Sequence, residues 1–302
     1  MTERVLALVG PTAAGKSEIA LEVASRLGAE IVAVDAFTVY RGMDVGTAKP
    51  SAAARQRVPH HGMDLLEPEE DCTVEWFQGE ARRAIADIRA RGRLPLLVGG
   101  SGLYFRAIVD DLTFPPTDPA VRADLESRHA GDPAAAHAEL ARVDPVAAAR
   151  IDPENVRRTV RALEVIELTG RPFSSWRVAW DAYRSIYPLA VVGVEIDRAV
   201  LAERIRERVD TMLEAGLLDE CRALARRPLS RAARQAIGYA EGLAWVRGAL
   251  SLQEMRERTR ARTRRYAARQ QRWFAGDPRV AWARADQAVA VLRRAAEEAP
   301  KG

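Results

Sequence analysis

The sequence is poor in the features that mark secreted, zinc-binding and membrane proteins. Its 302 residues include two cysteines, Cys72 and Cys221, which lie far apart and belong to no metal-binding motif. This usage is typical of a reducing compartment and argues against a zinc knuckle. No apolar run is long enough to cross a membrane, and Met1–Arg4 lead into the first predicted strand without a signal peptide. We therefore expect a soluble, cytoplasmic protein that is a monomer and has no membrane partner.

Lysine is also scarce, and arginine carries almost all of the positive charge. The net charge of +4 is mild, so by itself it is weak support for a nucleic-acid partner. Arginine favours bidentate contacts with phosphate, which makes the distribution of the arginines along the chain informative. The hydrophobic share of 48% and the charged share of 29% are those of a globular protein with one large domain or two smaller ones.

The residues Gly10–Ser17, G-P-T-A-A-G-K-S, fit the phosphate-binding loop G-x-x-x-x-G-K-[ST]. They stand between an apolar run at 5–9, which predicts a buried strand, and a helical apolar pattern that ends at Gly28. The loop glycines let backbone N–H groups turn toward an anion, and the helix N-terminus adds partial positive charge. Lys16 supplies a mobile ammonium, and the Ser17 hydroxyl can join a Mg²⁺ shell. The motif therefore predicts that the protein binds a polyphosphate.

Polar residues follow two of the other apolar runs, at the ends where a parallel sheet binds its ligands. Asp35 follows one predicted strand, where it could be a general base, a metal ligand or only a turn aspartate. Gly99–Ser101 follows another, where the glycines allow close approach of a ligand and the Ser101 hydroxyl could bind phosphate or Mg²⁺; a simple Gly-Gly turn is the alternative. Besides the run at 5–9, strands are expected at 30–34, 94–98, 189–196 and, as a last edge strand, 280–282.

The middle of the chain changes character. Between 115 and 187 we find no convincing buried strand, and Asp-Pro pairs, which are good helix-start signals, recur at Asp118, Asp132, Asp144 and Asp152. We interpret this span as a helical insertion. The expected fold class is therefore α/β, with a P-loop NTPase-like parallel-sheet core formed by 1–114 and 188–302 and a mostly helical insertion domain at 115–187.

A long basic helix is predicted at 252–274. Eight arginines and two glutamates between 251 and 274 leave a balance of +6, more than the net charge of the whole chain. A solvated helix face normally mixes charge signs, so this bias favours binding of a polyanion. One stripe of the helix holds mostly uncharged side chains: Met255, Thr259, Tyr266, Gln270 and Trp273. Another holds arginines: Arg258, Arg262, Arg265, Arg269 and Arg272.

Three further features leave their alternatives open. The polar, glycine-bearing segment 37–50 predicts a long ordered loop, and such loops are usually functional. His60 and His61 are adjacent, so they form a poor metal pair. Arg204 and Arg208 lie one helical turn apart, and this spacing fits either a phosphate clamp or two solvated surface charges.

Taken together, these stretches resemble the tRNA dimethylallyltransferase (tRNA isopentenyltransferase) family. The most specific strings are Tyr40–Pro50 and Gly99–Tyr104, while the phosphate loop alone is shared with many nucleotide-binding families. The other matching strings are Pro59–His61 with Asp64, Arg161–Glu164 with Thr169-Gly170, Ile237–Tyr239 with Glu241, and Thr263–Ala267 with Arg269-Gln270. The family transfers a dimethylallyl group from dimethylallyl diphosphate to N6 of an adenosine beside the anticodon, at position 37 of tRNA, giving N6-isopentenyladenosine.

The resemblance implies a role for particular positions. It implies a catalytic site of Asp35 as general base, Ser101 and Arg208, with Mg²⁺ as cofactor and Ser17 as its ligand. It implies that dimethylallyl diphosphate is bound by Gly10, Pro11, Thr12, Ala13, Ala14, Gly15, Lys16 and Ser17. It implies that the tRNA anticodon stem-loop is bound by the insertion and by Asp35, Thr38, Tyr40, Arg41, Lys49, Arg161, Arg258, Arg262, Arg265 and Arg269.

The sequence departs from the family where serine and glutamine often follow the base: here Ala36 and Thr38 stand in their place, which weakens any inference about polar contacts there. Three other functions share part of the pattern. A P-loop nucleoside or nucleotide kinase would not need the basic helix. An isopentenyltransferase acting on free adenine nucleotides would need neither the insertion nor that helix. A non-catalytic RNA-binding module would not need the complete set of Lys16, Ser17, Asp35 and Ser101.

Overall fold

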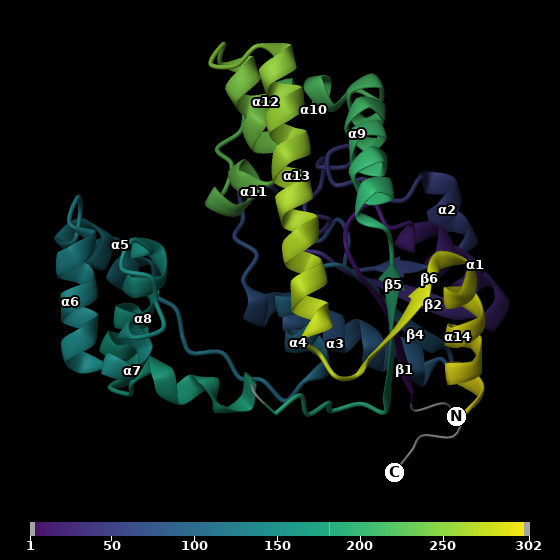
Figure 1. Cartoon of the computed structure of the whole chain (residues 1–302), viewed down its shortest axis with the longest axis horizontal. Helices are drawn as coiled ribbons and strands as arrows, with labels where there is room; N and C mark the ends of the chain where they lie inside the picture. The colour runs from purple at the N-terminus through teal and green to yellow at the C-terminus, as the bar shows by residue number, and fades with distance from the viewer. Residues whose placement is uncertain (1–3, 181, 299–302) are drawn as a thin grey trace. The chain divides into compact units, whose positions relative to one another are not determined.

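A computed structural model describes residues 4–180 and 182–298 and divides the chain into two compact units (Figure 1). The first unit joins Met1–Asp110 to Ser185–Gly302, and the second is Asp111–Arg184. Asp110 and Ser185 form an isolated antiparallel bridge, so the chain leaves and re-enters the first unit at one place. The second unit is therefore inserted into the first at a single point of entry.

The first unit is built on a six-stranded parallel sheet with the order β3-β2-β4-β1-β5-β6. This arrangement confirms the predicted α/β fold with a P-loop-like parallel core, and each of the five expected strands is present. His60–His61, which we did not predict as a strand, adds a two-residue edge strand beside β2. The strand bounds are β1 Val5–Val9, β2 Ala29–Val34, β3 His60–His61, β4 Leu94–Gly99, β5 Leu189–Glu195 and β6 Val280–Arg284.

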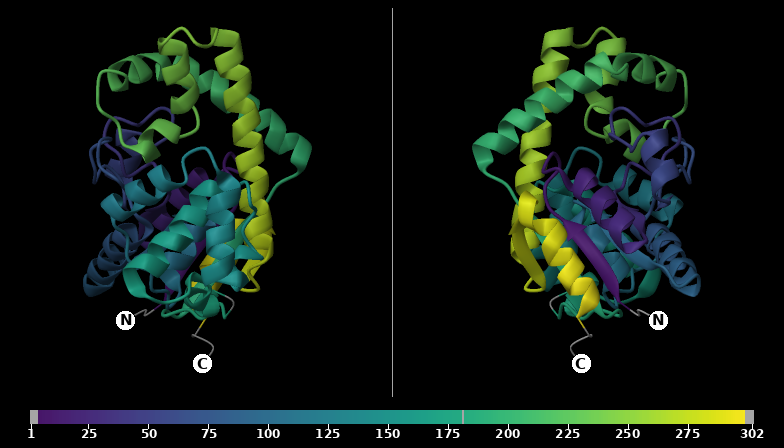
Figure 2. Two further views of the ribbon diagram at one scale, coloured as in Figure 1. Left: turned by 90° about the vertical axis from the view of Figure 1, so that its left-hand side faces the viewer. Right: turned by 90° about the vertical axis from the view of Figure 1, so that its right-hand side faces the viewer.

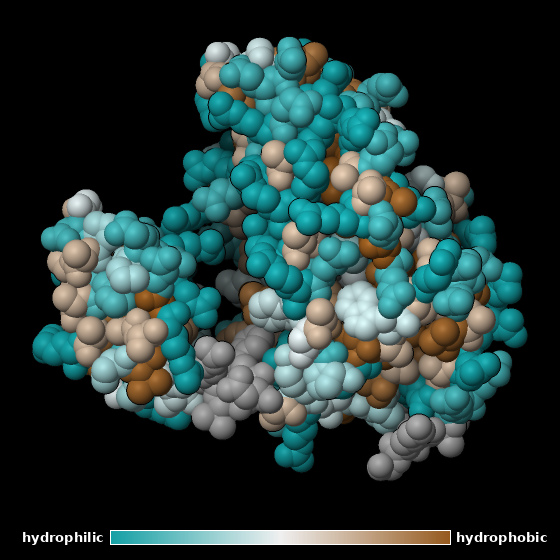
Figure 3. All heavy atoms as spheres, in the orientation of Figure 1, coloured by the Kyte–Doolittle hydropathy of each residue, from teal (hydrophilic) through white to brown (hydrophobic). Residues whose placement is uncertain are grey.

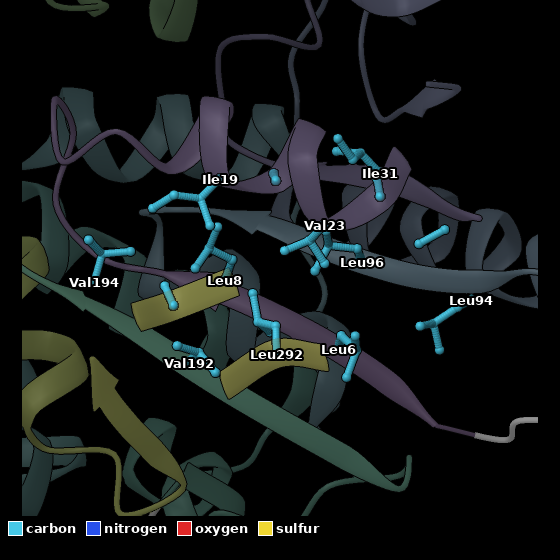
Figure 4. Packing of buried hydrophobic residues seen from close by; sticks show 14 of the residues in the cluster. Leu6, Leu8, Ile19, Val23, Ile31, Leu94, Leu96, Val192, Val194 and Leu292 are labelled. Carbon is cyan, nitrogen blue, oxygen red and sulfur yellow. The ribbon is translucent and has the colours of Figure 1, made fainter. Parts of the chain in front are cut away.

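Helices cover both faces of the sheet, which is why its central strands are apolar along their whole length. Leu6 and Leu8 point to the face packed by α1 (Lys16–Leu27) and α14 (Ala285–Glu297), where Leu292 meets them (Figure 4). On the other face, α3 (Val74–Ala90) and α4 (Gly102–Val109) bring Phe77 and Ile108 against alternate residues of the same strands. The two cores fix the strand ends, and with them the loops that follow.

Further helices of the first unit gather beyond the carboxyl ends of the strands, and the last of them, α13, runs from there down to α4 (Figures 1 and 2). They are α9 Arg198–Glu214, α10 Leu217–Leu224, α11 Arg231–Gln235, α12 Tyr239–Val246 and α13 Leu252–Ala275, with the short α2 at Ala52–Arg57. A third apolar core joins α10–α12 to Val39, Tyr40 and Met43, so the predicted loop at 37–50 is fastened to these helices.

The two longest of these helices each bury one face. In α9 the buried residues follow helical spacing: Leu201, Ile205, Val209 and Met212. In α13, Met255, Thr259 and Gln270 are buried. Trp273, which continues the same predicted stripe, is 43% exposed, and the neighbouring Phe274 is buried. The buried stripe is displaced by one residue at the end of the helix. Alternating steps of three and four residues average about 3.5 residues per turn, whereas an α-helix has about 3.6, so the two patterns separate along a long helix.

The second unit is helical, with no strand among its described residues. Its helices are α5 Pro119–Arg128, α6 Pro133–Val143, α7 Pro145–Ala148 and α8 Val156–Thr169, followed by the 3-10 helix η1 at Phe173–Trp180. Three of the four Asp-Pro signals begin a helix. The fourth prediction was wrong: Asp152 accepts a hydrogen bond from the Glu154 amide and makes a turn, and Asn155 caps α8 instead.

One buried carboxylate organises this second unit. Glu164 has no exposed side-chain surface and lies in an ion pair with Arg122 at 2.8 Å and another with Arg161 at 2.9 Å. It also accepts hydrogen bonds from the Thr117 hydroxyl and the Asp118 amide. The chain that leads into α5 is therefore tied to the middle of α8. Across the residues that the structure describes, no helix of either unit is long and apolar enough to span a membrane.

Candidate active site

The phosphate loop folds as its glycines predict. Gly10 and Gly15 have φ values of 140° and 87°, a region that favours glycine, and Ala13 also adopts a left-handed φ of 64°. These turns bring the loop over the start of α1. The Lys16 ammonium donates to the carbonyl oxygens of Gly10 at 3.0 Å and Pro11 at 2.7 Å. The cation is thus held over its own loop, where a bound anion would meet it.

A second element steadies the loop from outside. Gln270 of α13 is 5% exposed and its side-chain oxygen accepts the Thr12 amide at 2.8 Å. The same side chain closes over Gly100, where a Cβ would lie 2.1 Å from the Gln270 amide nitrogen. A Cβ on Gly99 would lie 2.1 Å from the Val34 carbonyl oxygen. Glycine is therefore required at both positions, because backbone and side chains of three elements pack without space for a methyl group.

A cleft of about 590 Å³ opens on this loop at the carboxyl ends of β2 and β4. It brings together three of the predicted polar groups, Lys16, Asp35 and Arg208, from α1, the end of β2 and α9. Other predicted residues that line it are Thr12, Ala13, Gly15, Ser17 and Thr38. Arg204, the other residue of the possible phosphate clamp, also lines it, together with Glu207, Tyr266 and Gln270, to which we assigned no role. Ser101 caps α4 directly after Gly100, next to the cleft but outside its lining.

Asp35 is the carboxylate of this cleft. Burial raises its pKa, while hydrogen bonds from the amides of Phe37 and Thr38 and the charges of Lys16 and Arg208 oppose the rise. The Phe37 amide donates to its Oδ1 at 2.8 Å. A carboxylate whose pKa is raised binds a proton more readily than one in water, and one of its oxygens is fixed by the backbone. Asp35 can therefore serve as an oriented general base.

Two cations face this single carboxylate. Burial lowers the pKa of Lys16 to about 7, with a further decrease from Arg208 and an opposing increase from Asp35. Burial also lowers the pKa of Arg208, again opposed by Asp35. Burial is the main cause of both decreases, and the Asp35 carboxylate is the neighbouring charge that opposes them. The cleft is consequently suited to an added anion of more than one charge, lying between the phosphate loop and α9.

Comparison with known proteins agrees with this geometry. Residues 38–277 match the model of the family described as IPP transferase, and residues 3–59 match one described as isopentenyl transferase. The chain belongs to the IPP transferase family. It is 51% identical over 286 residues to a tRNA dimethylallyltransferase of Nocardioides sp., covering 93% of this chain and 91% of the relative. It is 50% identical over 282 residues to that of Streptomyces coelicolor, covering 92% of this chain and 89% of the relative.

Solved structures of this family have the same fold. The full-length tRNA isopentenylpyrophosphate transferase of Bacillus halodurans is 39% identical, with a TM-score of 0.71 over 97% of this chain and 95% of that one. A eukaryotic dimethylallyltransferase, described as acting on tRNA, is 26% identical, with a TM-score of 0.81 over 96% of this chain and 77% of that one. The match extends over almost the whole chain, well beyond the shared phosphate loop.

Two predicted tRNA contacts of this family member are buried. Tyr40 is fully buried, and its hydroxyl accepts the Cys72 amide at 3.2 Å. The Lys49 side chain is 1% exposed and lies 2.5 Å from Asp44 and from Asp64 in ion pairs. Neither side chain offers surface to an RNA, so we correct their predicted role. Both hold the loop at 37–50, whose residues Thr38, Thr47 and Ala48 line the cleft.

The predicted arginine contacts fall into two groups. Arg161 donates to Glu164 and to the carbonyl oxygens of Pro115 and Pro116, and Arg262 pairs with the buried Glu241 and donates to the Gln235 carbonyl at 3.0 Å. These two are largely used by the fold. The other group is exposed: Arg41, Arg258, Arg265 and Arg269. In the described part of the chain, no carboxylate forms an ion pair with Arg265 or Arg269.

Gln270 and Tyr266 are the functional-site residues that sequence reasoning missed. Both stand on the stripe of the basic helix that also carries Met255 and Thr259, and we predicted no role for that stripe. The signal that could have found them is chemical: a glutamine has an amide to satisfy, and on a buried helix face it needs a polar partner. The Thr12 amide is that partner.

Proposed function

We propose that this protein is a tRNA dimethylallyltransferase. It transfers a dimethylallyl group from dimethylallyl diphosphate to N6 of adenosine 37, on the 3′ side of the anticodon, giving N6-isopentenyladenosine. The observation that carries the proposal is the cleft itself, in which one oriented carboxylate, Asp35, and two basic side chains, Lys16 and Arg208, lie beside a phosphate loop. Family membership and relatives of that name support it.

The donor half of the reaction uses the cations. The carbon–oxygen bond of the allylic diphosphate breaks, and its electron pair leaves with the diphosphate. Backbone amides at the start of α1, together with Lys16 and Arg208, stabilise the negative charge that develops on the leaving diphosphate. This stabilisation is the main task of the enzyme, because the allylic carbon itself ionises readily. The Ser101 hydroxyl, at the start of α4, adds a donor near the same end of the cleft.

The acceptor half uses Asp35. The adenine N6 amine forms the new carbon–nitrogen bond with the allylic carbon, and the proton that it loses passes to the Asp35 carboxylate. The base must leave the stacked anticodon loop to reach the bottom of the cleft, which single-stranded loops permit at low cost. Thr38 and Tyr266 line the cleft near Asp35, where they can orient the adenine.

The residues present fit a Mg²⁺ ion held together with the substrate. Among the described residues, no three His, Cys, Asp or Glu side chains gather as a metal site. Ser17 is exposed at the cleft and offers a hard oxygen ligand, and Mg²⁺ commonly takes one or two protein oxygens with substrate phosphates and waters. Ser17 would hold the ion, and Asp35 is one of the carboxylates that line the same cleft, with Glu18 and Glu207. When bound, the ion neutralises charge on the diphosphate.

The tRNA would be bound through phosphate contacts by the exposed arginines of α13, with the helical second unit gripping the anticodon stem. Arg258, Arg265 and Arg269 recur on an exposed stripe of α13, and such a stripe can lie along an RNA backbone. This placement also separates the proposal from an enzyme acting on free nucleotides, which would have no use for the stripe.

One experiment decides among the candidate functions. Purified protein is incubated with Mg²⁺, labelled dimethylallyl diphosphate and, separately, unmodified tRNA, AMP or ATP. We expect label in tRNA alone, at adenosine 37. Label in AMP or ATP would instead establish an isopentenyltransferase of free nucleotides. No transfer to any acceptor, with tRNA still bound, would establish a non-catalytic RNA-binding protein and overturn the proposal.

A further inference from the structure

Trp273, in the last turn of α13, has an unusual environment for a large aromatic residue. It is 43% exposed, although the segment that contains it packs against the core through Phe274. Its five-membered ring covers Gly102, the first residue of α4: a Cβ at Gly102 would lie 2.0 Å from Cδ1 and 2.1 Å from Nε1 of the indole. The ring rests on the glycine backbone, while a large part of its surface is open to solvent.

The position of Trp273 relates it to the cleft. Gln270, one helical turn earlier, lines the cleft, and Gly102 follows Ser101 and Gly100 at the end of β4. Arg265 and Arg269 precede Trp273 by eight and four residues, so the three side chains follow one another along one face of α13. Figure 3 shows a predominantly hydrophilic surface over this helix. An exposed aromatic ring thus ends a cationic stripe beside the cleft.

This combination is the one that single-stranded RNA requires. Proteins bind unpaired nucleotides by stacking bases on aromatic side chains beside a cationic track for the backbone. When the reactive adenosine enters the cleft, the base next to it in the loop loses a stacking partner. An indole at the cleft edge, with one side supported by Gly102 and Arg269 one turn away, can replace that partner.

We propose that Trp273 is a stacking platform for the unpaired base that flanks the reactive adenosine in the anticodon loop. The inference rests on the proposed function, because it takes tRNA as the ligand, but it assigns a binding site for a second base outside the catalytic cleft. Stacking on one aromatic side chain typically changes affinity by about 5- to 100-fold. The alternative is that Trp273 only shields Gly102.

Two substitutions separate these roles. Trp273→Leu keeps an apolar cover over Gly102 but removes the flat ring, whereas Trp273→Phe keeps a ring. We expect the leucine variant to raise the KM for tRNA about 5- to 100-fold, with an unchanged KM for dimethylallyl diphosphate and an unchanged kcat at saturating tRNA. The phenylalanine variant should lie close to the wild type. Leu252→Ala, which alters another exposed apolar residue of α13, is the matched control and should change neither constant.

A second measurement needs no protein variant. An anticodon stem-loop that carries 2-aminopurine next to the reactive adenosine should lose fluorescence on binding to the wild type. A stem-loop with an abasic nucleotide at the same position should bind the wild type more weakly, but it should bind the leucine variant no more weakly than the intact loop does. Equal KM values for the leucine and phenylalanine variants, or full affinity for the abasic loop, would overturn the platform. Absence of transfer to any tRNA by the wild type would instead overturn the proposed function.

Discussion

The pKa of Lys16 leads to a prediction about how donor binding depends on pH. In the free protein that pKa is lowered to about 7, so most of the lysine is neutral above pH 7. A bound diphosphate favours the ammonium, so binding above pH 7 must take up a proton. If the pKa in the complex lies well above 9, the fraction of free protein that is already protonated falls about 25-fold between pH 7.5 and 9, and the dissociation constant should rise by about the same factor.

The ligand's own ionisation opposes this trend, because a more highly charged diphosphate binds more tightly. Lys16→Met provides the control, since it keeps the ligand's ionisation and removes the lysine. Dissociation constants for dimethylallyl diphosphate are measured by calorimetry at several pH values between 7.5 and 9, in two buffers of different ionisation enthalpy. The difference between wild type and Lys16→Met isolates the proton taken up by Lys16. An identical pH dependence in the two proteins would refute the reasoning.

The two neighbouring charges supply a test of sign. Arg208 lowers the pKa of Lys16 and Asp35 raises it. Arg208→Gln should therefore move the pH at which affinity begins to fall upward, and Asp35→Asn should move it downward. Because both substitutions remove one charge from the same cleft, opposite displacements exclude a general effect of disturbing the site. Displacements in the same direction would mean that Lys16 is not the titrating group.

Three further predictions concern catalysis, RNA binding and folding. Asp35→Ala should lower the single-turnover rate by about 10²- to 10⁴-fold while tRNA affinity in a filter-binding assay stays within twofold, and a near-normal rate would remove Asp35 from the role of base. Replacing both Arg265 and Arg269 with glutamine should flatten the log–log salt dependence of tRNA binding by about one unit for each lost phosphate contact. An unchanged slope in the folded double variant would show that these arginines do not touch RNA phosphates. Arg262→Gln should instead mainly lower the melting temperature, because it removes the ion-pair partner of the buried Glu241. Glu164→Ala should lower the unfolding free energy of the second unit by about 2–4 kcal/mol, measured by urea denaturation. A loss below 1 kcal/mol would mean that the ion pairs of Glu164 with Arg122 and Arg161 contribute little to the stability of this unit.

Most of the fold could be predicted from the sequence because its strands are buried on both faces. Continuous apolar runs such as Val5–Val9 leave no other interpretation in a chain with a phosphate loop. His60–His61 could not be recognised as a strand, because two polar residues are too short a segment to show the alternation or the apolar run by which strands are predicted. The Asp-Pro pair at Asp152 failed for a local reason: its carboxylate accepts the amide two residues on, a bond that favours a turn over a helix start.

The candidate site was predictable where chemistry follows from topology and not where it follows from packing between distant segments. Asp35 had to meet the phosphate loop because parallel strands end at one edge of the sheet. Nothing in the local sequence of Tyr40 or Lys49 indicates that helices far along the chain bury the loop that contains them. In the same way, the arginines of α13 look alike in sequence, and only the position of Glu241 distinguishes Arg262 from its exposed neighbours.

The single point of entry of the second unit has a consequence for how such an enzyme can be altered. Val109 and Ile186 are joined by a backbone hydrogen bond of 2.8 Å, and Asp111 and Arg184 by one of 3.2 Å. A tight turn in place of 111–184 would therefore leave every strand of the sheet and every residue of the cleft covalently continuous. A different helical module could therefore be grafted at the same junction, while the cleft and the exposed arginines of α13 stay in the first unit.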